Sequence, residues 1–442
     1  MSRRPLVLVL AAVLAATAVA TSVVHTSNPT VVVSSLSTSP VESTALYCAG
    51  LGASGTPAGH VVVLNTTAHT RDVEVEIDAD AGAPVTRHLV LAAHASASVA
   101  PPASGHWFGM SLIVNGRGVV GDELNTAGAA QTPCLDSGST DWYASGLDTA
   151  VGSRAYLVLY NPSSTSTVVN VTAETASGFS APAPYQGVAI AAHRVVSLPL
   201  GIRIVNQANV GIHVRVIRGA VVATAVQQSG TFTSFNAGSA ALARTAWFPR
   251  VTTVSGALAR ILITNPSNAT ASVTASIGLP PYNVAPQRVS VAPFSTGSIV
   301  ITPNSAVPAH GYATVQLRST VAVATSLATG TLNGQSLSVP ATPSKLYLVS
   351  DFAGLGFDAM TATNVGARAL AVTVTVLGTI ATSRVVTLAP GTTVALRGRD
   401  GLPTTLHGRS FLITANHSDL VVATTLPTTP PGIVVVSALN GG

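Results

Sequence analysis

The chain has 442 residues, of which 47% are hydrophobic and only 8% are charged, and its formal net charge is +5. This length accommodates several domains. Long helix-forming side chains are scarce, with three methionines and a single lysine, so a mainly helical protein is excluded. Valine and threonine are abundant, and their β-branched side chains fit extended strands. The composition therefore predicts an all-β fold.

The N-terminus has the features of an export signal. Arg3 and Arg4 precede residues 5–24, which contain no charged residue. Ala18-Val19-Ala20 matches a signal-peptidase site, but 20 residues without a charge also suffice to span a bilayer. Residues 1–24 are therefore predicted to be a signal peptide or a transmembrane helix that anchors the protein in a membrane. Either alternative places the remainder outside the cytoplasm, and residues 25–44 are predicted to be a linker.

Four landmarks recur in the same order, four times along the chain. The first is a strand that ends in asparagine, and these asparagines lie 96, 104 and 99 residues apart, at Asn65, Asn161, Asn265 and Asn364. The second landmark follows, at Leu91–His94, Ile190–His193, Val291–Phe294 and Leu388–Gly391. Each unit opens with an aromatic strand and closes with a short apolar strand, and the opening aromatics are Tyr47, Trp142-Tyr143, Trp247-Phe248 and Tyr347.

These landmarks predict four tandem repeats and a short tail. The predicted boundaries are 45–138, 139–241, 242–343 and 344–427 for the repeats and 428–442 for a tail with one strand. Seven strands are expected in repeat two, near 141–145, 154–160, 167–174, 186–190, 194–199, 210–217 and 220–227. Seven short strands favour an immunoglobulin-like β-sandwich. The alternative is a β-propeller, in which each period would contain two blades.

Two short segments near the two ends of the chain have similar sequences. Val31–Leu36 is similar to Val434–Leu439. Each of these strands could complete a sheet, or the two could pair with each other.

The chain contains two cysteines, Cys48 and Cys134, which bracket the first repeat. In an exported chain a small, even number of cysteines favours a disulfide. Closing a loop of this size would stabilise the fold by roughly 4 kcal/mol through the entropy of the unfolded chain. A metal site would need more ligands than these two residues provide, so we expect no metal and no cofactor.

These features together resemble a known family. The export segment, Tyr47–Gly50, Pro133-Cys134 and the recurrent strand–Asn-Pro-Ser turns resemble an uncharacterised family of secreted or membrane-anchored β-repeat proteins of high-GC Gram-positive bacteria. Asn65 and Asn364 depart from the pattern, because proline does not follow them. The resemblance covers nearly the whole chain and implies an extracytoplasmic location and a β-repeat architecture, but no activity and no site residues.

No motif predicts catalysis, and we expect that the protein is not an enzyme. Acidic residues are scarce outside repeat one, and a glycoside hydrolase needs two carboxylates across a cleft. The best candidates for such a pair are Asp136, Asp141 and Asp148, near the junction of repeats one and two. His94 and His193 occupy equivalent turn positions, where repeats three and four have Phe294 and Gly391, so a shared structural role is the preferred interpretation.

One strand of repeat one is acidic on a single face. Asp72, Glu74, Glu76, Asp78 and Asp80 alternate with apolar residues. The alternatives are a calcium site and a solvent-exposed face that protects an edge strand. The second is preferred, because a strand spaces successive carboxylates of one face too widely to enclose an ion.

Charge is unevenly distributed along the chain. Residues 25–134 have a net charge of −5, whereas residues 149–340 contain ten arginines and one acid. If arginines such as Arg215, Arg218 and Arg260 share a face, they would form an anion-binding surface for envelope polymers or lipid head groups. The alternative is that they only keep the surface soluble. Nucleic acid is not expected as a partner of an exported chain.

Three functions remain open from the sequence. The first, which we prefer, is a non-catalytic cell-envelope scaffold or binding protein with an envelope polymer or protein as its partner. The second is a carbohydrate-active enzyme. The third is an accessory subunit of an envelope glycan pathway that binds partners through Trp142, Trp247 or Phe248, although core packing is the simpler role for these aromatics.

Overall fold

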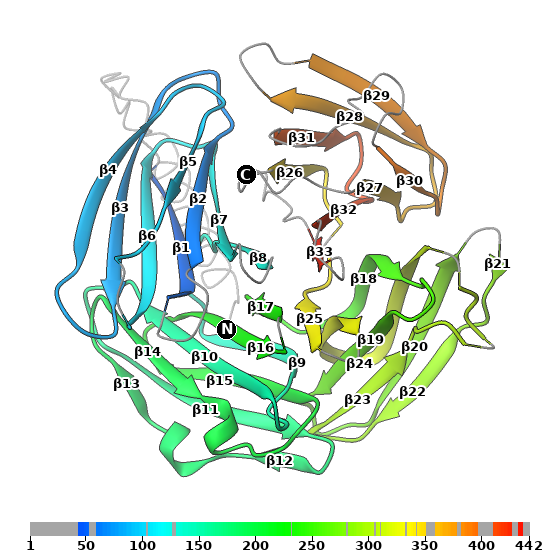
Figure 1. Cartoon of the computed structure of the whole chain (residues 1–442), viewed down its shortest axis with the longest axis horizontal. Coiled ribbons are helices and arrows are strands. Elements are labelled where there is room, and N and C mark those ends of the chain that lie inside the picture. Colours follow the sequence, from blue (N-terminus) through cyan, green and yellow to red (C-terminus); the bar gives the residue numbers. More distant parts are fainter. Residues whose placement is uncertain are drawn as a thin grey trace, which may run out of the picture. The chain divides into compact units, whose positions relative to one another are not determined.

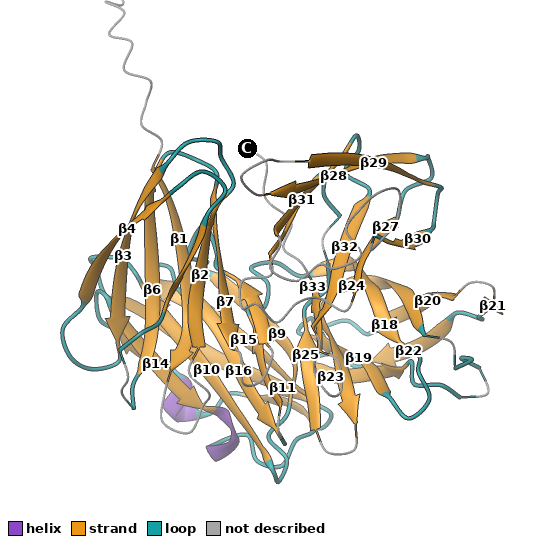
Figure 2. Ribbon diagram, turned by 45° about the horizontal axis from the view of Figure 1, so that its top comes forward, coloured by secondary structure: helices purple, strands orange, loops and turns teal. Residues whose placement is uncertain are grey.

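A computed structural model describes most of the chain after residue 42. The described residues are 43–52, 59–102, 105–125, 130–230, 232–279, 282–304, 306–309, 311–331, 334–341, 343–350, 359–377, 382–396, 410–426 and 432–435. The predicted export segment 1–24 and the strand Val31–Leu36 lie outside them, as does the linker except for its last two residues. In the described part of the chain, no helix is long and apolar enough to cross a membrane. Strands dominate, as Figure 2 shows, together with two short 3₁₀ turns, η1 (Ala183–Tyr185) and η2 (Leu200–Ile202).

Repeat one is a sandwich of two antiparallel four-stranded sheets (Figure 1). Its strands are β1 (Ser43–Gly52), β2 (Gly59–Asn65), β3 (Arg71–Ala79), β4 (Val85–Leu91), β5 (Ser96–Val99), β6 (Trp107–Asn115), β7 (Val119–Asn125) and β8 (Ala130–Pro133). The first sheet has the order β1-β6-β3-β4 and the second has the order β5-β2-β7-β8. The core lies between the sheets, where Val61 and Val63 of β2 meet Val73 and Val75 of β3.

Repeat two follows the same plan and contains all seven predicted strands. Its strands are β9 (Asp141–Leu147), β10 (Ser153–Asn161), β11 (Thr167–Thr175), β12 (Gly178–Ser180), β13 (Val188–Ile190), β14 (Arg194–Pro199), β15 (Val210–Arg218), β16 (Val222–Ser229) and β17 (Phe232–Asn236). The first sheet contains β9, β15 and β11, with β12 and β13 paired to β11, and a parallel pairing of Thr175 with Ser295 joins β11 to β23 (Ser295–Val300) of repeat three. The second sheet has the order β14-β10-β16-β17. The short strands β12 and β17 were not predicted.

Repeats three and four repeat this pattern. Repeat three contains β18 (Ala243–Thr252), β19 (Leu258–Asn265), β20 (Ala271–Leu279), β21 (Tyr282–Asn283), β22 (Gln287–Val291), β23 (Ser295–Val300), β24 (Tyr312–Thr331) and β25 (Gly334–Ser338). Repeat four contains β26 (Leu346–Ser350), β27 (Ala359–Asn364), β28 (Leu370–Leu377), β29 (Thr382–Leu388), β30 (Thr393–Ala395), β31 (Ser410–Ala415), β32 (Leu420–Leu426) and β33 (Gly432–Val435). The C-terminal strand β33 pairs with β32, in the place that β8 takes in repeat one.

The sheet orders confirm the sandwich and not the propeller. Neighbouring strands such as β6 and β3 are not consecutive in sequence, because the chain crosses between the two sheets within every repeat. This is the connectivity of Greek-key sandwiches. In repeat three the single strand β24 serves both sheets. In repeat two the chain turns between β15 and β16 at Gly219, whose φ angle is 87°. The corresponding residues 319–323, in the middle of β24, contain no glycine.

A buried asparagine joins the crossings between the sheets. In repeat two the amide Nδ2 of Asn161 donates hydrogen bonds to the carbonyls of Thr165, Ile190 and Ala191, at 2.8, 3.1 and 3.0 Å. Its Oδ1 accepts hydrogen bonds from the backbone N–H and the hydroxyl of Ser163, at 3.1 and 2.7 Å. Thr165 lies where the chain leaves the second sheet, and Ile190 and Ala191 lie where it returns. One side chain therefore holds both crossings together.

The same arrangement occurs in the other three repeats. Asn65, Asn265 and Asn364 are fully buried and donate to carbonyls of the same two turns. This link, formed by the hydrogen bonds of the asparagine side chain, thus connects the first two sequence landmarks. It forms whether or not proline follows the asparagine. Burial without these partners would be costly, because an amide carries both donors and an acceptor.

The residue that closes the second landmark has a left-handed backbone in every repeat. The φ angles are 57°, 52°, 52° and 67° at His94, His193, Phe294 and Gly391. Residues other than glycine are uncommon in this region. The structure therefore confirms a shared conformational role for these four positions.

The first sheet of each repeat packs against the second sheet of the next. A Cβ atom added to Gly109 would lie 2.5 Å from the ring of Tyr160, and one added to Gly211 would lie 2.1 Å from Thr264. Only glycine permits such close approach. Repeats three and four meet where the hydroxyls of Thr314 and Thr393 lie 2.7 Å apart. Repeats four and one also meet, and their cluster contains Leu377, Leu412, Leu64 and Val120.

We predict that Asn265→Ala destabilises the protein by about 3 kcal/mol, because several buried backbone groups lose their partners at once. Urea unfolding of the full chain measures this change. Asn268→Ala is the matched control, since Asn268 is exposed in the adjoining turn and its replacement should change the free energy of unfolding by less than about 0.5 kcal/mol. Equal effects of the two substitutions would contradict the proposed role of the link.

Candidate functional site

The acidic strand of repeat one is β3, and repeat two covers one end of it. Asp72 and Glu74 are exposed, Glu76 is half-buried and Asp78 is fully buried. The predicted solvent face therefore extends over only part of the strand. The prediction of an edge strand is wrong, because β3 pairs with β4 on one side and with β6 on the other.

A buried chain of hydrogen bonds ends on Asp78. Tyr160 belongs to β10 of repeat two, and its hydroxyl donates to Asp78 Oδ2 at 2.7 Å. The Tyr160 oxygen in turn lies 2.6 Å from the hydroxyl of Ser111 in repeat one. Burial is the main influence on the Asp78 carboxyl and raises its pKa, while the hydrogen bond from Tyr160 acts in the opposite direction. Asp78 is thus held in place from both repeats.

His193 reaches the same carboxylates from the left-handed turn of repeat two. Its Nδ1 lies 3.2 Å from Glu76 Oε1 and 3.7 Å from Asp78 Oδ2. The neighbouring guanidinium of Arg194 donates to the carbonyls of Ala79 and Gly82 and so fixes this turn against repeat one. Burial and the nearby Asp78 carboxylate raise the pKa of Glu76. Among the described residues, Glu76, Asp78 and His193 are the group whose ligand atoms lie close enough together, within 4.8 Å, to hold a metal ion.

The sequence indicated the acids of this site but not their partners. Tyr160 and His193 lie more than 80 residues after Asp78 in the chain, and their contact depends on how repeat two docks. In the sequence His193 takes a turn position where repeat four has Gly391, but His94 and Phe294 do the same, so this feature did not single out His193.

Glu174 occupies in repeat two the position that Asp78 occupies in repeat one. Each lies thirteen residues after the buried asparagine of its repeat, and each is fully buried. Burial raises the pKa of Glu174 to about 7, and its Oε2 has no hydrogen-bond partner. Burial likewise raises the pKa of Glu123, which lies on β7. Both carboxyls carry an energetic cost when they are ionised.

Two of the three candidate catalytic acids lie at opposite ends of one strand. Asp141 and Asp148 flank β9 and lie roughly 20 Å apart along this extended strand, which is too far for a glycoside hydrolase pair. Asp148 accepts hydrogen bonds from Ala150 N and Ser153 Oγ and so orders a turn. Asp141 contacts His213 Nε2 at 2.9 Å. Asp136 is exposed.

The three candidate anion-binding arginines are divided between two places. Arg215 lies opposite Asp141, at the start of β9, and Arg218 lies further along β15. Arg260 belongs to β19, and this strand meets β9 at Gly146, near the end of β9. Arg215 and Arg218 thus belong to repeat two and Arg260 to repeat three, and a shared anion-binding surface stays a prediction.

The aromatic residues that open repeats two and three serve mainly in packing. Trp142 and Phe248 are fully buried in the cores of their repeats, and the indole N–H of Trp142 donates to the carbonyl of Ala237. Trp247 is half-buried, and its backbone pairs with Ala341.

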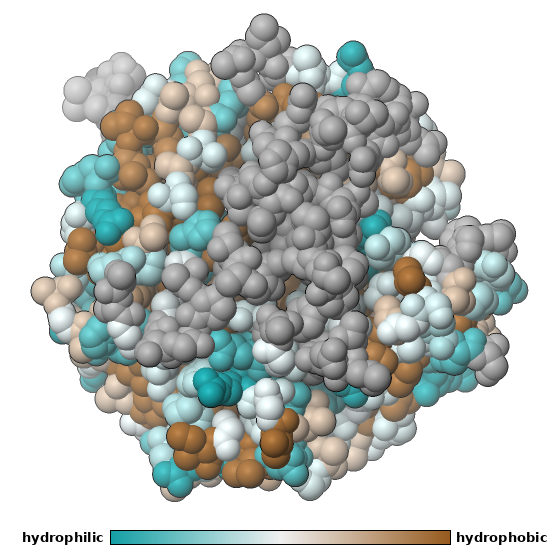
Figure 3. All heavy atoms as spheres, in the orientation of Figure 1, coloured by the Kyte–Doolittle hydropathy of each residue, from teal (hydrophilic) through white to brown (hydrophobic). Residues whose placement is uncertain are grey.

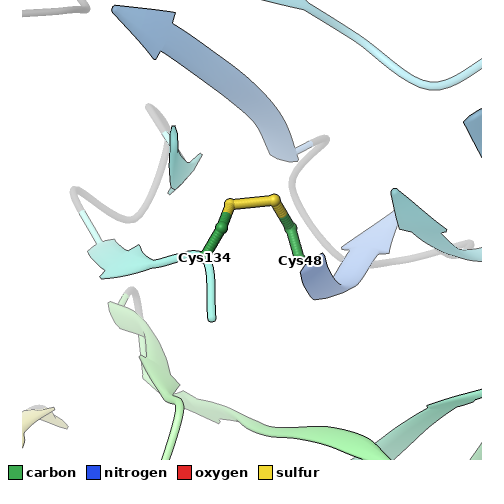
Figure 4. Close-up of a disulfide and its surroundings, with 2 residues drawn as sticks. All are labelled: Cys48 and Cys134. Atoms are coloured by element: carbon green, nitrogen blue, oxygen red, sulfur yellow. A yellow bond between two sulfur atoms is a disulfide. The ribbon is translucent and has the colours of Figure 1, made fainter. Parts of the chain in front are cut away.

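Cys48 and Cys134 form the predicted disulfide (Figure 4). The bond joins β1 to the segment that follows β8, and the two Cα atoms lie 4.5 Å apart. Tyr47 and Leu135 beside it exchange backbone hydrogen bonds at 2.7 and 2.8 Å. A buried disulfide of this kind indicates an oxidising compartment.

We predict that Glu174→Gln makes the protein more stable at pH 8 but not at pH 4. The folded-state pKa lies above the ordinary value of 4.5, so the folded state binds the proton more tightly than the unfolded state. The stability that this proton confers is complete below pH 4.5 and is lost as the pH rises to about 7. The gain at pH 8 should approach, at most, about 3 kcal/mol.

Urea unfolding of the wild type and the variant across this pH range measures the difference. Glu74→Gln is the control for replacing a carboxylate by an amide at the surface, because Glu74 is exposed. A constant difference between Glu174→Gln and the wild type from pH 4 to pH 8 would contradict the prediction.

Comparison with known proteins gives a family but no activity. A search of solved structures matched one described as "Crystal structure of tetra-tandem repeat in extending region of large adhesion protein", with 12% identity, covering 91% of this chain and 100% of that chain, at a TM-score of 0.11. At this score the likeness carries no argument. The search among curated proteins found no match. Residues 119–399, more than half of the chain, match a family of unknown function. The chain therefore belongs to the family of unknown function DUF5719.

Proposed function

We propose that the protein is a non-catalytic scaffold or binding protein of the cell envelope, exported and either secreted or anchored by its N-terminal segment. The observation that carries this proposal is the docking of each repeat on the next through whole sheet faces. Contacts such as Tyr160 with Asp78, Thr264 with Ser145 and Thr314 with Thr393 join the four sandwiches. Such an arrangement suits a protein that holds or presents partners.

The disulfide supports the proposed location. A bond between Cys48 and Cys134 persists outside the reducing cytoplasm, and the uncharged segment 5–24 behind Arg3 and Arg4 provides a route of export. Hydrophobic and hydrophilic side chains are interspersed over the described part of the face in Figure 3, as on a surface that contacts water. The proposed partner is an envelope polymer or an envelope protein.

The described acids support a non-catalytic role. Asp148 orders a turn, and Asp78 lies in a contact between two repeats. The roles of carbohydrate-active enzyme and glycan-pathway accessory subunit remain alternatives, and experiments on location and on the three acids can distinguish them.

We predict that a phosphatase reporter that folds only in an oxidising compartment is active when fused to the C-terminus of the full chain. Arg3 and Arg4 should keep the N-terminus inside and direct the remainder outward. Enzyme activity in intact cells measures this. The control is the same fusion without residues 2–24, which should be inactive. Activity that does not depend on this segment would contradict the export proposal.

We predict that the triple variant Asp136→Asn, Asp141→Asn and Asp148→Asn retains the cellular role of the protein, because Asp141 and Asp148 lie at opposite ends of β9 and Asp148 orders a turn. Complementation of a deletion strain, with envelope integrity as the readout, measures the role. Urea unfolding of the purified variant accompanies it. Loss of complementation with an unchanged unfolding curve would favour an enzyme over a scaffold.

A further inference from the structure

We propose that Glu76, Asp78 and His193 bind one divalent transition-metal ion of the Zn²⁺ type, and that this ion fastens repeat two to repeat one. Two ligands come from β3 and the third comes from the turn before β14, so the ion would join two sandwiches. The site goes beyond the scaffold function, and neither that function nor the family match implies it.

The distances suit a small cation. Zn²⁺ binds imidazole nitrogen and carboxylate oxygen at about 2.0–2.2 Å, which places neighbouring ligand atoms of a tetrahedral site about 3.4 Å apart. The separations from His193 Nδ1 are 3.2 Å to Glu76 Oε1 and 3.7 Å to Asp78 Oδ2. Only small side-chain movements are needed to bring the three atoms around one ion.

Two polar atoms at this site are buried without a hydrogen-bond partner. Asp78 is fully buried, and its Oδ1 has no partner. His193 Nδ1 is also buried and makes no hydrogen bond, even though Glu76 Oε1 lies nearby. Unsatisfied buried groups of this kind are costly. A bound cation would satisfy His193 Nδ1 directly, and it would satisfy Asp78 Oδ1 if Asp78 bound it through both carboxylate oxygens.

The surroundings of Asp78 match the outer shell of a metal site. Metal-binding carboxylates are themselves held by hydrogen bonds, which fix the direction of the ligand atom. Tyr160 donates to Asp78 Oδ2 at 2.7 Å, and Ser111 supports Tyr160 at 2.6 Å. Glu76 and Asp78 offer carboxylate oxygens within 4.8 Å of each other, and a cation between them would offset the repulsion of two carboxylates in a partly buried place.

The donor set selects among metals. One imidazole and two carboxylates suit Zn²⁺ and related transition metals. Ca²⁺ takes six to eight oxygen ligands, which is more than this site provides. The side chains of His193 and Glu76 are 34% and 23% exposed, so an ion could enter from solvent and retain a water ligand.

The chain contains its own control for this site. His94 has the same left-handed backbone in repeat one as His193 has in repeat two, but it does not belong to the Glu76–Asp78 group. Repeat four places Gly391 at the equivalent position. Glycine therefore suits the backbone at both histidines, and His193→Gly and His94→Gly form a matched pair.

The test is calorimetric titration of the tag-free full chain with ZnCl₂, together with determination of the bound metal after dialysis. We expect one Zn²⁺ per wild-type chain. His94→Gly should bind it equally, and His193→Gly should bind at least tenfold more weakly. Zn²⁺ should raise the melting temperature of the wild type and of His94→Gly but not that of His193→Gly. CaCl₂ should produce no comparable binding.

Glu76→Gln keeps the test decisive if His193→Gly does not fold, because Glu76 is only half-buried. This variant should also lose at least tenfold in affinity for Zn²⁺. Absence of bound Zn²⁺ in the wild type would overturn the proposal, as would unchanged binding by Glu76→Gln. In either case the export and scaffold proposals, which are tested separately, would stand.

Discussion

The fold of every repeat depends on one buried asparagine. A sandwich of this topology must pass its chain from the second sheet to the first and back again, and both crossings expose backbone carbonyls within the protein. The side chain of Asn161 reaches both crossings, because its amide N–H groups donate to both turns while its oxygen accepts from Ser163 in the first of them. Neither aspartate nor an aliphatic residue could make both kinds of bond. The same residue therefore ends the corresponding strand in all four repeats.

The sequence predicted the interior of a repeat better than the contacts between repeats. Alternation of apolar residues in strands such as 167–174 marks which side faces the core, so the strands of repeat two and the sandwich class could be inferred. The disulfide followed from the cysteine count and the export segment. Short strands such as β12 and β17 carry too few residues for a periodic pattern.

The sequence contains no pattern that predicts the contacts between repeats. Asp78 follows the alternation of a solvent face, and only the docking of Tyr160 and His193 converts it into a buried group. This docking depends on the shapes of two complete sheets, including the close approach at Gly109. The junctions also differ from one another, since the position of Asp78 is taken by Glu174, Gly278 and Leu377 in the later repeats. Each repeat is thus matched to its own neighbour, and the order of the repeats is not interchangeable.

The disulfide has a mechanical consequence for a protein that experiences tension along its length. Cys48 and Cys134 are separated by 86 positions in the sequence, and a pulling force on the two ends of the chain is transmitted directly through the bond between them. The enclosed loop cannot extend, although its fully stretched length would be roughly 290 Å. Repeat one therefore stays short under a load that unravels the later repeats. Repeat one behaves as an inextensible link, and the three later repeats can lengthen.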